Sequence, residues 1–144
     1  MCRRSVPGLG PERTRSHQVS ELVSVVASVI VAAVFVVASV TKFASPAAWL
    51  DQARGLGVPR SIALVVPVAE AVLGAWLLVQ WERRAAAITA AVVISAFSAL
   101  IVVRLVQGRR PPCACFGSLS ARPLGPGSLV RNAVLLAVAL LAMA

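Results

Sequence analysis

The stretch from Ile62 to Val103, IALVVPVAEAVLGAWLLVQWERRAAAITAAVVISAFSALIVV, decides the fold of this chain. It holds two apolar runs, 62–79 and 85–103, separated by the short polar segment Trp81–Arg84. Each run approaches the roughly 20 residues that an α-helix needs to cross the hydrocarbon core of a bilayer. Because only a tight turn lies between them, the two helices must be antiparallel neighbours. The sequence therefore predicts a hairpin of two membrane-spanning helices.

Two further apolar runs flank this hairpin, Leu22–Val40 before it and Leu129–Ala144 after it. The first run is longer than the apolar region of a signal peptide, so we interpret it as an uncleaved transmembrane helix. Ser128 is expected to be the N-cap of the last helix. The basic segment 1–20, rich in arginine, proline and glycine, is expected to be a disordered tail ahead of a membrane domain at 21–144.

A shorter helix is expected between the first and second spans. Ser45 and Pro46 have the residue types of an N-cap and a first helical position, and the pattern continues to about Arg54. Trp49 lies on the apolar side of this segment, so we expect the helix to rest on the membrane interface with Trp49 at headgroup depth.

The composition favours a membrane protein over a soluble one. Hydrophobic residues make up 59% of the 144 residues and charged residues 13%, and the charges lie almost wholly between the apolar runs. A soluble four-helix bundle would need a polar face on each helix, which these runs lack. The net charge of +9 does not indicate nucleic-acid binding, since the arginines flank apolar segments. The predicted fold is all-α, a polytopic four-transmembrane-helix bundle with both termini on one side; the Lys and Arg count does not choose the orientation.

Glu70 lies near the middle of the second span, where a carboxylate costs several kcal/mol unless it is paired, protonated or in a wet interior. It is either a functional group or a packing element paired with a cation, for which Lys42, Arg104 and Arg131 are the candidates. Pro67 lies one turn earlier and frees a backbone carbonyl that needs another donor. Arg131 and the adjacent Asn132 should face the protein interior, because lipid would penalise them.

The loop between the third and fourth spans holds two closely spaced cysteines, Cys113 and Cys115, shortly after Arg109 and Arg110. Nearby positive charge favours the thiolate over the thiol and makes such cysteines reactive. A disulfide between residues only two apart closes a very small ring and departs from relaxed geometry, so it is easily reduced. The pattern favours thiol–disulfide exchange over structural stapling.

Interpretations of the cysteine pair without redox chemistry remain open. The two thiols could be inert, or they could be acylated, as juxtamembrane cysteines sometimes are. A metal site is disfavoured, because it would need further ligands and the remaining Cys2 and His17 are expected on the opposite face.

The motifs that suggest a family are Cys113-Ala114-Cys115-Phe116-Gly117, Arg122-Pro123-Leu124-Gly125, Arg131-Asn132, Lys42-Phe43, Gly55-Leu56-Gly57-Val58-Pro59, and Pro67, Glu70 and Gly74. Together they resemble the MauE family of methylamine-utilisation membrane proteins, relatives of the DoxX-like four-helix proteins. The resemblance covers about Leu22 to Ala144 and leaves out the basic tail. Ala114 stands where glycine is expected, and both sulfurs are kept.

The resemblance implies an inner-membrane, multi-pass protein that supports disulfide formation in exported redox enzymes, with methylamine dehydrogenase as the namesake client. It implies a thioredoxin-like partner or an exported client, and a cysteine loop outside the cytoplasm, which would leave both termini cytoplasmic. The predicted activity is oxidoreductase-like exchange through Cys113 and Cys115, with Glu70 and Arg131 as supporting groups and Arg109 and Arg110 tuning the thiols or steering an acidic partner. A quinone in the bundle is conceivable as a cofactor. The alternatives are a non-catalytic assembly factor and a small-solute transporter centred on Glu70.

Overall fold

The computed structural model describes residues 11–111 and 123–144, and their regular structure is helical throughout. The helices are α1 (Pro11–Ala44), α2 (Pro46–Gly55), α3 (Arg60–Val79), α4 (Arg83–Val106) and α5 (Pro126–Ala142). Among the described residues, α1, α3 and α4 are long and apolar enough to cross a membrane, and α5 is a shorter apolar helix of 17 residues. The predicted hairpin is confirmed as α3 and α4.

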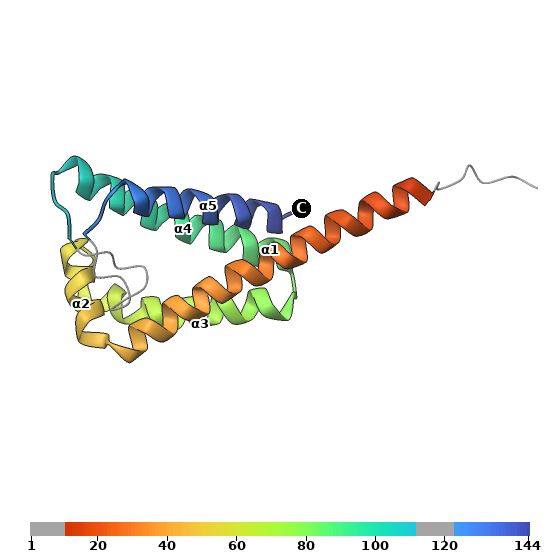
Figure 1. The fold of residues 1–144 in the computed structure, drawn as a ribbon. Coiled ribbons are helices and arrows are strands. Elements are labelled where there is room, and N and C mark those ends of the chain that lie inside the picture. Colours follow the sequence, from red (N-terminus) through yellow and green to blue (C-terminus); the bar gives the residue numbers. More distant parts are fainter. Residues whose placement is uncertain (1–10, 112–122) are drawn as a thin grey trace, which may run out of the picture.

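The helices form two pairs, capped at one end by α2 (Figure 1). α1 packs along α3, α4 packs along α5, and α1 also contacts α5. α2 lies across one end of the pairs, while the start of α1, the α3–α4 turn and the C-terminal residue lie toward the other end (Figure 1). The short helix expected from Ser45 and Pro46 is therefore present, with Ser45 at its N-cap position.

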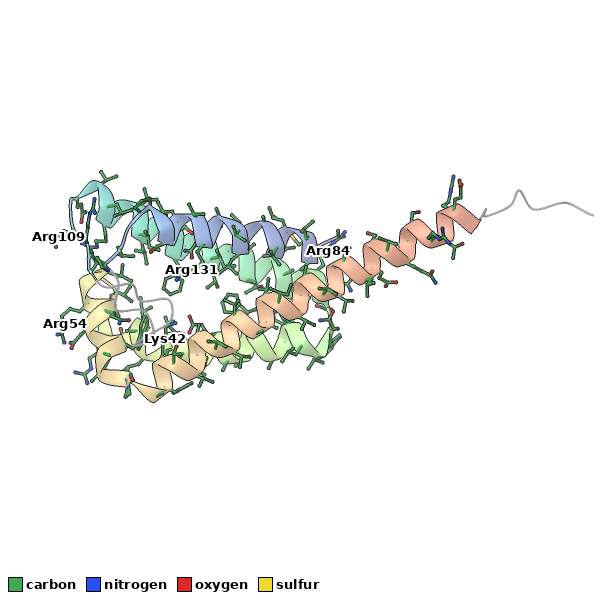
Figure 2. The ribbon with its side chains drawn as sticks, viewed as in Figure 1. Lys42, Arg54, Arg84, Arg109 and Arg131 are labelled. Carbon is green, nitrogen blue, oxygen red and sulfur yellow. The ribbon has the colours of Figure 1, made fainter. Side chains whose placement is uncertain are left out.

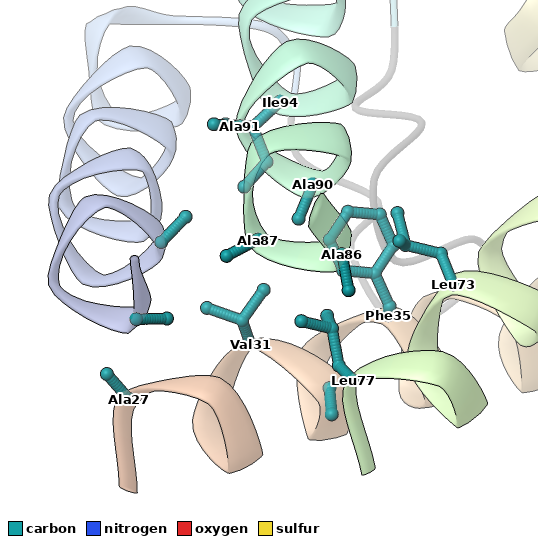
Figure 3. Close-up of a cluster of buried hydrophobic side chains, with 13 residues drawn as sticks. Ala27, Val31, Phe35, Leu73, Leu77, Ala86, Ala87, Ala90, Ala91 and Ile94 are labelled. Atoms are coloured by element: carbon teal, nitrogen blue, oxygen red, sulfur yellow. The ribbon is translucent and has the colours of Figure 1, made fainter. Parts of the chain in front are cut away.

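Small residues let the helices approach closely, as membrane helices commonly do. Four alanines of α4 and Ile94 share one buried cluster with Val31 and Phe35 of α1 and with Leu73 and Leu77 of α3 (Figure 3). Gly74 of α3 lies against the α1 backbone: a Cβ built there would stand 3.3 Å from the Ala32 carbonyl oxygen. Close contact between α1 and α3 therefore depends on Gly74, and α4 contributes mostly alanines to the same core.

Two helix starts differ from the sequence predictions. α1 begins at Pro11, so residues 11–20 are helical rather than disordered, with proline in the first turn and Glu12 near the positive end of the helix dipole. Residues 1–10 lie outside the described part of the chain. α5 begins at Pro126 with Gly125 as its N-cap, rather than after Ser128, because proline is suited to the first helical position.

Two glycines end helices in the same way. Gly57 follows α2 with φ +77° and Gly108 follows α4 with φ +69°, the left-handed conformation that glycine adopts without strain. After α2, the Gly57 amide donates to the Arg54 carbonyl and the Val58 amide to the Ala53 carbonyl. After α4, the Gly108 and Arg109 amides donate to the Leu105 and Arg104 carbonyls in the same pattern. Both are Schellman C-caps, which turn the chain sharply away from the helix.

These glycines make a matched pair for mutation. Replacing Gly108 with alanine should cost about 1–2 kcal/mol through backbone strain, since open space surrounds Gly108. Replacing Gly57 with alanine should cost more, because the new methyl group would displace the Arg104 guanidinium and break its bond from Nε to the Leu56 carbonyl oxygen, now 3.0 Å. Unfolding free energies of the two variants in detergent measure the difference. Equal costs would show that the Arg104 contact contributes nothing.

Candidate functional site

The segment that carries Cys113 and Cys115 lies outside the described residues, but both of its flanks are described. The Leu124 amide donates to the Pro111 carbonyl oxygen at 2.9 Å, which closes the chain across the segment. Leu124 is 1% exposed and packs with Trp49 and Leu56. Pro111 lies directly against Gly55 at the end of α2. Both flanks of the cysteine segment, Pro111 and Leu124, therefore lie beside α2.

A buried ion pair lies beneath this anchor. Lys42, in the last turn of α1, donates from Nζ to both carboxylate oxygens of Glu70 in α3, at 2.8 and 2.9 Å. The two side chains are 1% and 7% exposed. Of the three cations considered for Glu70, the structure pairs it with Lys42, whereas Arg104 bonds the Leu56 carbonyl and the Gln107 side chain. A two-point contact of this kind compensates much of the cost of burying both charges.

Trp49 of α2 links the ion pair to the proline in α3. The Lys42 ammonium lies 4.9 Å from the centre of the indole ring, within cation–π range. The indole Nε1 donates to the Ala63 carbonyl at 2.7 Å. Ala63 is four residues before Pro67, so its carbonyl is the one that loses its helical donor to the proline ring. Trp49 is 2% exposed, so its indole is turned into the protein toward this carbonyl and Lys42; its headgroup depth in the membrane stays a prediction.

Arg131 and Asn132, in the first half of α5, face the protein interior as expected. Both line a hollow of about 60 Å³ that also touches Glu70, and Asn132 is 4% exposed. The Asn132 side-chain nitrogen donates to Ser98 of α4 at 3.2 Å. Figure 2 shows Arg131 between the two helix pairs, on the side that faces Lys42. Polar groups from α1, α3 and α5 thus converge on one interior region.

A larger groove of about 440 Å³ opens between α3 and α4. Its walls are apolar and include the rings of Phe35, Trp76 and Phe97, with Glu70 at its inner side. The volume lies within the range of small-molecule pockets, roughly 300–1,000 Å³, so the groove has room for the apolar ring of a cofactor such as a quinone. Among residues 11–111 and 123–144, no three acidic, histidine or cysteine side chains come together as metal ligands.

Arg109 and Arg110 follow the Schellman cap of α4 and are exposed at the end that carries α2. They stand three to six positions before the two cysteines in the sequence, whereas the ion pair lies inside the helical domain. The site residues inferred from the sequence therefore fall into two groups, an interior group with Glu70 and Arg131 and a surface group with Arg109 and Arg110.

Sequence reasoning missed two participants in the interior group. Trp49 was assigned to the interface, and Ser39 was not noticed, although its hydroxyl donates to the Pro67 carbonyl at 2.8 Å. The sequence contained a signal for each residue. Pro67 disturbs the hydrogen bonds of its helix, and polar side chains on neighbouring segments are the natural donors to the carbonyls affected. Which residue meets which carbonyl depends on how the helices are rotated about their axes, which residue spacing does not give.

These features define a class of protein, an integral membrane protein of apolar helices with a buried ion pair between two of them. The chain belongs to the MauE family: the family model described as methylamine utilisation protein MauE matches residues 20–144. A methylamine utilization protein MauE from Paracoccus denitrificans is 35% identical over 82 residues, which cover 56% of this chain and 44% of that protein. The alignment thus spans less than half of the relative's length. No solved structure matches the chain.

Proposed function

We propose that this protein is a membrane-bound thiol–disulfide exchange factor in which Cys113 and Cys115 react with a thioredoxin-like partner or an exported redox enzyme. Its clients would be of the methylamine dehydrogenase type, in keeping with a family of membrane proteins linked to methylamine utilisation. The observation that carries the proposal is the anchoring of the cysteine segment. The bond between Pro111 and Leu124 holds both flanks on α2, at an end where arginines are exposed.

The proposed chemistry needs only the two sulfurs and a partner. One thiolate attacks a sulfur of the partner's disulfide and forms a mixed disulfide, and the partner's other sulfur leaves as a thiolate. The second cysteine then attacks the mixed disulfide, which releases the partner as a dithiol and leaves a disulfide between Cys113 and Cys115. Two electrons pass to the partner, and the reverse sequence oxidises a partner dithiol. A disulfide between cysteines only two residues apart is strained and easily reduced, which suits a protein that must pass its disulfide on to a partner.

The proposal includes a topology with four crossings. The 17 residues of α5 would span about 26 Å, near the lower limit for a transmembrane helix of about 17 residues. With α1, α3 and α4 as the other crossings, α2 and the cysteine segment lie on one side of the membrane and both termini on the other. We place the cysteine segment outside the cytoplasm, in the plasma membrane of the cell, where exported clients fold.

Single replacement of Cys113 or Cys115 by serine tests the proposal. Each variant should lose nearly all client maturation in cells, because one sulfur cannot resolve the mixed disulfide. One of the two should also trap a partner in a covalent complex that dithiothreitol releases, visible on a non-reducing gel. Replacement of Cys2 by serine is the matched control, since it also removes a thiol but lies far from the pair in the sequence.

The rival role is an assembly factor that holds the client without redox chemistry. Full client maturation in the Cys113→Ser/Cys115→Ser double variant would establish that role and remove the exchange proposal. The transporter alternative gains no support from the geometry, because the Glu70 carboxylate is held at both oxygens by Lys42.

A further inference from the structure

We infer that the end of the molecule formed by α2 and the chain after α4 is a docking surface for an acidic protein. This surface, called the arginine face below, consists of five arginines and one acidic residue: Arg54, Arg60, Arg104, Arg109, Arg110 and Asp51. That the docked protein is the exchange partner of Cys113 and Cys115 rests on the proposed function. The acidic character of the partner rests on the charges alone.

The charge is distributed unevenly between the two ends of the described chain. The arginine face carries five cations against Asp51, a net charge of +4. The opposite end carries Arg13, Arg15, Arg83 and Arg84 against Glu12, Glu21 and Glu82, a net charge of +1. Figure 2 shows Arg54 and Arg109 at the first end and Arg84 at the second. A concentrated charge of one sign attracts a surface of the other sign and speeds its association.

In the proposed topology with four crossings, the arginine face points into water rather than sideways into lipid. α2 lies across the ends of the other helices (Figure 1), burying Trp49 and Ala53 and exposing Asp51 and Arg54 on its outer side. The ion pair between Arg54 and Asp51 is 3.2 Å long and more than 70% exposed on both sides, so it contributes little to stability. Its charges remain available to a partner.

Arg109 and Arg110 follow a helix that is longer than the hydrocarbon core is thick. α4 has 24 residues and is therefore about 36 Å long, against a hydrocarbon core of about 30 Å. The Gly108 cap then turns the chain off the helix axis toward α2, where Pro111 meets Gly55. Lipid phosphates are the usual partners of arginines at span ends, but this pair lies past the helix end and beside the anchored cysteine segment. A soluble protein that visits that segment must meet these two charges.

Binding of a fluorescent poly-L-glutamate to the full chain in a non-ionic detergent tests the inference. The Cys113→Ser/Cys115→Ser variant serves as the background, so that the result is independent of thiol chemistry and of the proposed function. At low salt, Arg109→Glu/Arg110→Glu should weaken binding by about tenfold or more, and about 0.5 M salt should remove most of the difference. Arg13→Glu/Arg15→Glu changes the net charge equally at the other end and should have a small effect.

Two outcomes would overturn the inference. Equal weakening by both double variants would mean that net charge alone attracts the polymer. If Arg109→Glu/Arg110→Glu left poly-L-glutamate binding intact but reduced binding to vesicles of equal parts phosphatidylcholine and phosphatidylglycerol, the face would serve lipid headgroups. Circular dichroism of each variant, with unchanged helicity, confirms that the comparison is between folded proteins.

Discussion

Replacing Glu70 with methionine should lower the free energy of unfolding by about 3–5 kcal/mol, the cost of breaking a buried ion pair by removing one partner. The Lys42 ammonium, 1% exposed, would stay in the interior without the carboxylate that now contacts it at 2.8 and 2.9 Å. Lys42→Met should have a similar cost, because it leaves the Glu70 carboxylate buried. Denaturation of the purified protein in detergent, followed by circular dichroism, measures both.

The double variant Lys42→Met/Glu70→Met separates the ion pair's structural role from a functional one. Removing both charges should recover most of the lost stability, since apolar residues of similar volume often replace a buried pair at little cost. If the double variant costs as much as the two single variants added together, Lys42 and Glu70 are not coupled and the ion pair does not stabilise the interior. A double variant that folds but no longer supports client maturation would assign the pair a role in function as well.

Replacing Trp49 with phenylalanine should cost about 1–3 kcal/mol, because the Ala63 carbonyl would lose its donor while still buried. Phenylalanine keeps a ring near the Lys42 ammonium, so the change isolates the indole hydrogen bond of 2.7 Å. The predicted loss comes from Pro67, which cannot supply the amide that normally bonds the carbonyl four residues earlier.

Restoring that amide should rescue the Trp49 variant. In a Pro67→Ala background, the alanine amide can donate to the Ala63 carbonyl, so Trp49→Phe should cost about 1 kcal/mol less than it does beside Pro67. Four unfolding free energies close this double-mutant cycle. A coupling energy near zero would indicate that Trp49 stabilises the protein by packing alone. Ser39 is unchanged throughout and keeps its bond to the carbonyl of residue 67.

Much of the fold followed from the order of apolar and polar residues. The hairpin of α3 and α4, the short helix after Ser45 and the apolar helix near the C-terminus were all predicted, because run length and turn chemistry are local properties. Helix starts were less certain. Residues 11–20 looked too polar to fold alone, yet they continue α1, since a helix already formed at 24–44 extends at little cost once its nucleus exists.

The interior site was predicted only in part. An intramembrane Glu70 and a proline-freed carbonyl were recognised as groups that need partners, and both have them. The choice of Lys42 over Arg104 and Arg131, and the inward position of Trp49, depend on helix rotation and on where α2 crosses the end of the domain. Both depend on tertiary packing, which cannot be predicted from the spacing of residues in a single sequence. The roles of Cys113 and Cys115 stay predictions, since they lie outside the described residues.

The hydrogen bond between Pro111 and Leu124 makes the region between them a cassette with a fixed base. Because both ends of this region lie against α2, its length has little effect on the free energy of the fold, since each doubling of a connection costs only about 0.6 kcal/mol of closure entropy. Residues inserted between Pro111 and Leu124 should therefore leave the packing of the helices in the membrane unchanged.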